Sequence, residues 1–195
     1  MTPDRDLSDA LGGAPDAPPT RASVAVPDPL HAVVGEVEGH VAEAGWDQPP
    51  QLFALVETEA LLRAEPQLAQ TMGIVAGIPG GMTPVAQEPL GDGPLDERLS
   101  GLVFGPEVLG VALAHEVLVL PPSAEAALED VDDPAAVAAE HPDRREVRMV
   151  VGVLRDGSRA AVLRLRGTGG EPDERVTGPD LAPGLAEALL ATLED

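Results

Sequence analysis

Four residue types are missing from this chain, which contains no Lys, Cys, Tyr or Asn. The absence of Cys excludes disulfides, thiolate nucleophiles and thiolate-bound zinc. Without Lys and Tyr there is neither a Schiff-base amine nor a phenolic acid. Four His, a few Ser and Thr and many carboxylates remain, and they form no recognisable catalytic motif. The sequence therefore identifies no catalytic residue and implies no cofactor.

Aromatic side chains and long hydrophobic runs are also scarce. Trp46, Phe53 and Phe104 are the only large rings, so the core is expected to consist of Leu, Val and Ala. No apolar run approaches the roughly 20 residues that a membrane span needs. Residues 1–19 have no hydrophobic centre of the kind found in signal peptides. These features predict a cytoplasmic chain with no membrane association.

Positive charge is the scarcest property of the chain. All 12 basic residues are Arg, against 34 Asp and Glu, which gives a net charge of −22. A chain this acidic repels the phosphates of nucleic acids and the surface of anionic membranes. We therefore expect neither kind of partner, and a protein partner remains possible.

Composition divides the chain into an arm and one domain. Residues 1–26 are rich in Asp and Pro and poor in apolar residues, so we expect a disordered acidic arm. Residues 27–195 have the length and apolar content of a single domain.

Apolar periodicity and turn residues predict the elements of that domain. Asp28 and Pro29 form a helix-start signal, and Gly45 is a typical helix-end residue. Helices are expected over 29–44, 58–64, 68–72, 95–102 and from 180 onward. Strands are expected over 51–56, 82–87, 108–120, 146–154 and 159–166, with a polar loop over 167–178.

The last two predicted strands form the clearest local signal. Asp156-Gly157 between two β-rich runs is typical of a type I′ hairpin turn. An antiparallel hairpin after alternating helices and strands favours an α+β fold. We expect an antiparallel sheet of about five strands with helices packed on one face. This order is loosely similar to that of secretion chaperones, a likeness at the level of fold alone.

Several segments together resemble an uncharacterised family of acidic single-domain proteins of actinobacteria. They are Gly45-Trp46-Asp47-Gln48-Pro49-Pro50 with the following Leu52 to Val56, Met82-Thr83-Pro84-Val85, Val151 to Gly157, and Gly178-Pro179-Asp180-Leu181. The resemblance covers most of the chain from about residue 30 onward. It implies a bacterial cytoplasmic protein of one domain, and no activity that can be carried over.

The Arg residues are unevenly distributed. Eight of the 12 fall between Arg144 and Arg175, where only five residues are acidic, so this window carries about +3 and the remainder about −25. Arg159, Arg164 and Arg166 alternate along one predicted strand, and all three, or at least the last two, should project from one face. They either pair with carboxylates of the same chain or bind an acidic partner through their guanidinium groups.

Three other residues are candidates for a functional role. Trp46 could be a recognition residue or could cover the end of the sheet. His115 lies in the most apolar predicted strand, where burial would shift its pKa. His40 lies on one helix face with Glu36 and Glu43, a pattern that we interpret as a solvated acidic face and not as a metal site.

The leading hypothesis is therefore a non-enzymatic adaptor or chaperone-like domain that acts by protein–protein contact. One alternative is a small hydrolase that uses carboxylates and His, with or without a divalent metal. Another alternative is a structural subunit of a larger complex. The sequence leaves open whether the chain is a monomer or a homodimer.

Overall fold

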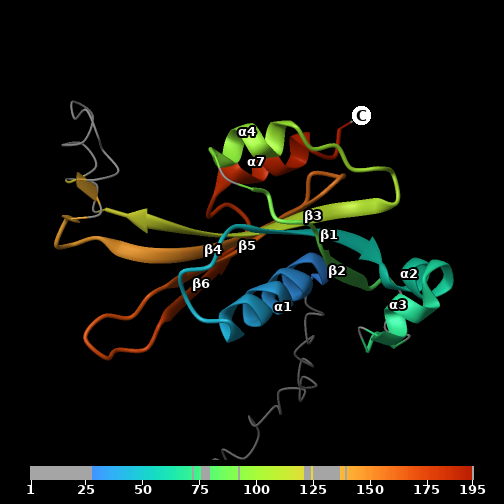
Figure 1. Ribbon diagram of the computed structural model, residues 1–195, viewed down its shortest axis with the longest axis horizontal. Helices are drawn as coiled ribbons and strands as arrows, with labels where there is room; N and C mark the ends of the chain where they lie inside the picture. Colours follow the sequence, from blue (N-terminus) through green and yellow to red (C-terminus); the bar gives the residue numbers. More distant parts are fainter. Residues whose placement is uncertain are drawn as a thin grey trace, which may run out of the picture.

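A computed structural model gives the structure of residues 28–71, 73–75, 80–91, 93–120, 124, 137–138 and 140–194 (Figure 1). The predicted acidic arm, residues 1–26, lies outside these described residues.

One antiparallel sheet of six strands organises the fold, in the order β2-β1-β3-β4-β5-β6. Its strands are β1 (Gln51–Glu57), β2 (Met82–Ala86), β3 (Val108–Val119), β4 (Arg145–Leu154), β5 (Arg159–Leu165) and β6 (Glu174–Gly178). This confirms the expected α+β class with an antiparallel sheet, and adds one strand. Strand β6 lies where a polar loop was expected. The expectation was wrong because β6 is an exposed edge strand with one large apolar residue, Val176, and so shows no apolar alternation.

Helix α1 (Pro29–Glu43) covers one face of the sheet. It starts as expected: the carboxylate of Asp28 accepts a hydrogen bond of 3.1 Å from the backbone N–H of Leu30, and Pro29 follows as the first helical residue. The apolar stripe of α1 packs on buried residues of four strands, namely Phe53, Leu55, Ala112, Ala114, Val150, Ala160 and Val162.

The opposite face of the sheet is also covered, which differs from the expected single helical layer. Helices α4 (Leu95–Ser100) and α7 (Pro183–Ala191) lie together on this side (Figure 1). The physical reason is visible in β3, where Val111, Ala112, Leu113 and Ala114 are all buried. A strand that is apolar on both sides needs cover on both sides. Two short helices, α2 (Thr58–Ala64) and α3 (Pro66–Thr71), connect β1 to β2 beyond one end of the sheet.

The β4–β5 hairpin forms as expected, but its turn is not the predicted type I′. That turn requires positive φ at two consecutive residues, whereas here Gly157 has φ 85° and Asp156 does not have a positive φ. The backbone N–H of Gly157 donates to the carbonyl of Leu154 at 2.9 Å. This hydrogen bond closes a four-residue β-turn, and the left-handed glycine is the last residue of that turn. The Asp156 carboxylate accepts the backbone N–H of Ser158 instead, and this hydrogen bond lowers the pKa of Asp156.

Strands β3 and β4 extend past the layer formed by α4 and α7 (Figure 1). We call this extended part the distal half of the sheet; it comprises residues 115–119, 145–149, 163–165 and 174–176. One of its faces is charged and the other is apolar, and both carry candidate residues.

Candidate functional site

A row of charged side chains crosses the distal half of the sheet on the side of α1. The strand register aligns Glu116 of β3 with Arg148 of β4, Arg148 with Arg164 of β5, and Arg164 with Arg175 of β6. One register step closer to the core, Ala114, Val150 and Val162 pack against α1. Because alternate residues of a strand share a face, the charged row continues the face that α1 covers.

Arg148 is the most buried member of this row, with 1% of its side chain exposed. Its Nε and Nη2 donate to Oε1 of Glu116 at 3.0 and 2.6 Å, and Nη2 also donates to the carbonyl of Gly45. The guanidinium lies over the ring of Trp46, 4.6 Å from its centroid. A charge this deeply buried is tolerable because a carboxylate, a carbonyl and an aromatic face all surround it.

The charged row fixes the loop between α1 and β1. Gly45 and Asp47 both adopt positive φ, at 84° and 67°, which turns the loop back over the sheet. Oε2 of Glu116 then accepts the backbone N–H groups of Asp47, at 2.8 Å, and Gln48, at 3.3 Å. Trp46 completes the attachment by donating from Nε1 to Asp173 at 3.3 Å.

Glu38 of α1 neutralises two Arg residues from above the sheet. Its side chain is 2% exposed and accepts two hydrogen bonds from Arg164, one of them 2.9 Å between Nη2 and Oε2. Nε of Arg175 lies 3.2 Å from Oε2 of the same carboxylate. The hydrogen bond to Glu38 raises the pKa of Arg164 above its ordinary value, so this guanidinium stays charged at any accessible pH.

Arg166 extends the network at its exposed end. Its guanidinium bonds to the carboxylate of Glu146, lies 3.7 Å from that of Asp47 and 5.4 Å from the centroid of Trp46. The hydrogen bond to Glu146 raises the pKa of Arg166. The carboxylates of the network outnumber its guanidinium groups. The cations are Arg148, Arg164, Arg166 and Arg175, and the anions are Glu38, Asp47, Glu116, Glu146 and Asp173.

The structure brings together three of the four residues expected to bind a partner. Trp46, Arg164 and Arg166 belong to this one network, where they contact groups of their own chain. Arg159 does not join them. It differs from Arg164 by an odd number of residues and therefore points to the opposite face of β5. A role of these four residues in partner binding stays a prediction.

Sequence reasoning missed Glu38, Arg148 and Glu116 as the centre of the network. Glu38 follows Val34 by four residues and so belongs to the apolar stripe of α1. That spacing was the available signal for a buried carboxylate in need of a cation. No such signal marked Arg148, because its neighbours are determined by the strand register.

The other face of the distal half is apolar and extends beyond the core that α7 covers. Leu113, Val151 and Ala161 pack in that core. The next two steps of the register align His115 with Met149, Leu163 and Val176, then Val117 with Val147 and Leu165. We define the distal apolar face as Val117, Val119, Val147, Met149, Leu163, Leu165 and Val176. These side chains belong to neither hydrophobic core cluster of the described residues, and Val147 is nevertheless buried, with 4% exposed.

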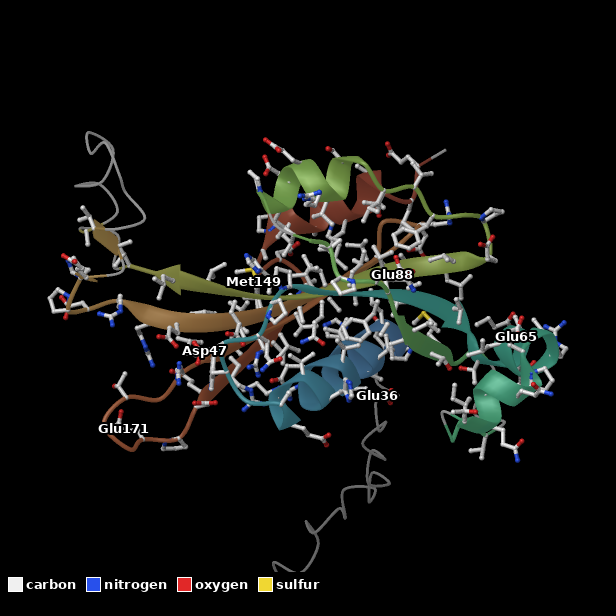
Figure 2. The ribbon with its side chains drawn as sticks, viewed as in Figure 1. Glu36, Asp47, Glu65, Glu88, Met149 and Glu171 are labelled. Carbon is white, nitrogen blue, oxygen red and sulfur yellow. The ribbon has the colours of Figure 1, made fainter. Side chains whose placement is uncertain are left out.

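Figure 2 shows the contrast between the two faces. Met149 lies on the side of the sheet that carries α4 and α7, whereas Asp47 lies on the side of α1. Val119 and Val176 are 39% and 38% exposed, and Val117, Met149, Leu163 and Leu165 are partly exposed. In the distal half, the charged network therefore lies under the α1–β1 loop and the apolar face points outward. An ordinary antiparallel sheet has the opposite arrangement, with its apolar face buried and its polar face in solvent.

The two candidate histidines lie on different elements, His40 on α1 and His115 on β3, and differ in burial. His40 is exposed on α1 and lines a shallow hollow with Glu36 and Pro84. His115 is partly buried at the inner margin of the distal apolar face, and its Nδ1 has no hydrogen-bond partner among the described residues. Burial lowers the pKa of His115, while the charge of Glu116 partly opposes this shift.

We expect His115 to make stability depend on pH on the acid side of neutrality. Because its pKa is lower in the folded than in the unfolded chain, the unfolded chain binds the proton first as the pH falls below about 6.5. The free energy of unfolding should therefore fall between pH 7.5 and pH 5.5 by more in the wild type than in His115→Leu. Urea titrations at the two pH values measure this difference. Met149→Leu changes the cross-strand neighbour without removing a titratable group, and should keep the wild-type dependence.

The described residues lack two further features, a metal-binding cluster and a membrane-spanning helix. They contain no group of three or more His, Asp or Glu side chains placed to hold a metal ion. None of their helices combines the length and the apolar character that crossing a bilayer requires.

Comparison with known proteins gives one match. No curated protein and no solved structure is similar to this chain, so the likeness to secretion chaperones stays a prediction. The model of one protein family, described as PPA1309-like protein, matches residues 30–194. Because the match spans nearly the whole chain, this protein belongs to the uncharacterised family of PPA1309-like proteins.

Proposed function

We propose that this protein is a non-enzymatic adaptor or chaperone-like domain of the cytoplasm, and that it binds a segment of a partner protein on the distal apolar face. The observation that carries the proposal is the orientation of the distal half of the sheet. Six partly or fully exposed apolar side chains from four strands surround the buried Val147 on its outward side, beyond the core under α7. Contiguous apolar surface on a soluble protein usually marks a site of interaction.

The charged network supports this proposal because it makes the face rigid. The α1–β1 loop is attached to β3 and β4 through Glu116 and Arg148, and α1 is attached to β5 and β6 through Glu38. A face held in one shape costs less entropy on binding than a face that must first become ordered. The actinobacterial source expected from the sequence resemblance is part of the same proposal.

A second copy of the chain is a less favourable occupant than a different protein. Each copy carries a net charge of −22, so two copies repel one another as they approach. A partner segment with apolar side chains covers the same surface without bringing a second charge of this size.

Selection from a displayed library of random peptides tests the proposal. We expect the full-length protein to enrich peptides with an apolar centre, and expect Val119→Gln together with Val176→Gln to weaken their binding about tenfold, as the loss of two contact residues does. Fluorescence anisotropy of a labelled selected peptide gives the dissociation constants. The matched control is Val75→Gln with Val103→Gln, which changes two exposed valines elsewhere, at 76% and 72% exposure. These should bind within about twofold of the wild type.

Three results would count against the proposal. The first is the absence of any enriched apolar peptide, and the second is an equal loss of binding in the control variant. The third is a stable dimer in sedimentation at micromolar concentration that dissociates in the Val119→Gln, Val176→Gln variant. That dimer would assign the distal apolar face to a second copy of this chain.

A further inference from the structure

A cationic pocket lies where the distal apolar face ends. This cavity of about 310 Å³ is lined by Arg144, Arg145 and Arg166, with Glu146 as its one carboxylate and Thr168 as a hydroxyl group. The charge of its lining is positive in a chain whose net charge is −22. We call it the arginine pocket.

Arg144 and Arg145 set this pocket apart from the charged network on the other face. Arg148, Arg164, Arg166 and Arg175 all pair with carboxylates. Arg144 and Arg145 are exposed, and no ion pair joins either of them to a carboxylate within the part of the chain that the structure describes. One Nη of Arg144 contacts the carbonyl of His141 at 3.4 Å, which leaves its other donors available.

The arginine pocket lies at the end of the distal half and meets the distal apolar face at Arg145. Arg145 is aligned in the register with Val119, and it shares a face of β4 with Val147 and Met149. Arg166 and Glu146 line the pocket from the other face, where they belong to the charged network. A segment that lies on the apolar face and runs toward the start of β4 therefore reaches Arg145 and the neighbouring Arg144, which make no ion pair within the described residues.

We propose that the arginine pocket binds the carboxylates of a short acidic stretch next to the apolar part of the partner segment. This inference rests on the proposed function and names the chemistry of the partner. Guanidinium groups bind carboxylates through paired hydrogen bonds in a fixed geometry. The net charge of the protein opposes a segment with a few acids less than it opposes a second copy of charge −22, because the repulsion grows with the charge of the ligand. Charges beyond roughly 8 Å are also largely screened at physiological ionic strength.

The test compares selected peptides on the wild type and on Arg144→Gln with Arg145→Gln. Peptides enriched by the wild type should carry Asp or Glu at one end of their apolar centre. Converting those acids to amides in a selected peptide should weaken binding to the wild type about five- to tenfold and should leave binding to the double variant unchanged. The effect should shrink at high salt. Arg159→Gln, which changes an Arg at the other end of β5, is the matched control and should behave as the wild type.

The outcomes separate this inference from the proposed function. Enrichment of apolar peptides without acids would overturn the inference and leave the proposed function standing, whereas no enrichment at all would overturn both. Acidic peptides that bind equally well to the double variant would also overturn the inference. Residues 129–133 contain four acids and lie outside the described residues. An acidic peptide that binds only after Glu129, Asp130, Asp132 and Asp133 are changed to amides would assign the pocket to this run of the chain itself, against the inference.

Discussion

Replacing Arg148 with Ala should lower the free energy of unfolding by about 3 kcal/mol, the lower end of the range for breaking a buried ion pair. The side chain is 1% exposed and meets Glu116, the carbonyl of Gly45 and the face of Trp46. Its removal leaves the charge of Glu116 without a cation and the Gly45 carbonyl without its donor. We choose the lower end because Glu116 is 17% exposed and keeps the backbone N–H groups of Asp47 and Gln48. Urea denaturation followed by circular dichroism measures the loss.

Two further variants show whether the unpaired charge causes this loss. Arg148→Met with Glu116→Gln removes both charges and keeps a carbonyl oxygen for the loop N–H groups, so it should be more stable than Arg148→Met alone. Arg166→Ala breaks an ion pair whose cation is 39% exposed, and should cost much less than Arg148→Ala because solvent screens exposed pairs. If Arg148→Ala and Arg166→Ala cost the same, the burial of Arg148 has no energetic consequence and the interpretation of the network is wrong.

The elements with strong local signals could be predicted from the sequence. The cap formed by Asp28 and Pro29, the apolar run of β3 and the glycine-containing turn after β4 are each determined by residues near one another in the chain. These signals gave the α+β class and the antiparallel sheet. Strand β6 was missed because an exposed edge strand needs no apolar alternation, and its pairing with β5 is the main contact that defines it.

The charged network and the distal apolar face could not be predicted in the same way. Both depend on which residues face one another across strands, and a shift of one residue in the register exchanges the two faces. Arg148 and Arg164 are 16 positions apart, and they become neighbours only because the hairpin turn is longer than the one predicted. Arg159 shows the same dependence, because its position on the opposite face follows from counting along β5.

The covering of the sheet on both sides was, in contrast, available from the sequence. Residues 111–114 form a continuous apolar run without a polar position, which is typical of a strand buried on both faces. The prediction of helices on one face gave too little weight to this run. The same run explains why the sheet turns amphipathic only from Glu116 onward, in the distal half beyond α4 and α7.

Enlarging Gly152 should destabilise the fold by displacing α1. Gly152 lies in register between Ala112 and Ala160, and these three small residues form the surface on which α1 rests. A Cβ atom at Gly152 would lie 2.4 Å from a methyl group of Val34 and 3.2 Å from one of Leu30, so α1 would have to move. Overpacking of this kind typically costs about 1–3 kcal/mol. We expect Gly152→Ala to fall in that range and Gly152→Val to cost more, both measured by urea denaturation.

The matched control for Gly152 is Gly39→Ala in α1, where an added Cβ would meet nothing within 4 Å. Since Ala favours helix over Gly, this variant should gain up to about 1 kcal/mol. A displaced α1 also moves Glu38 away from Arg164, so the cost of Gly152→Ala should be smaller when Glu38 is already Gln. If the two substitutions add without coupling, α1 tolerates the extra methyl group in place, and the small residues under it do not determine where Glu38 meets the charged row.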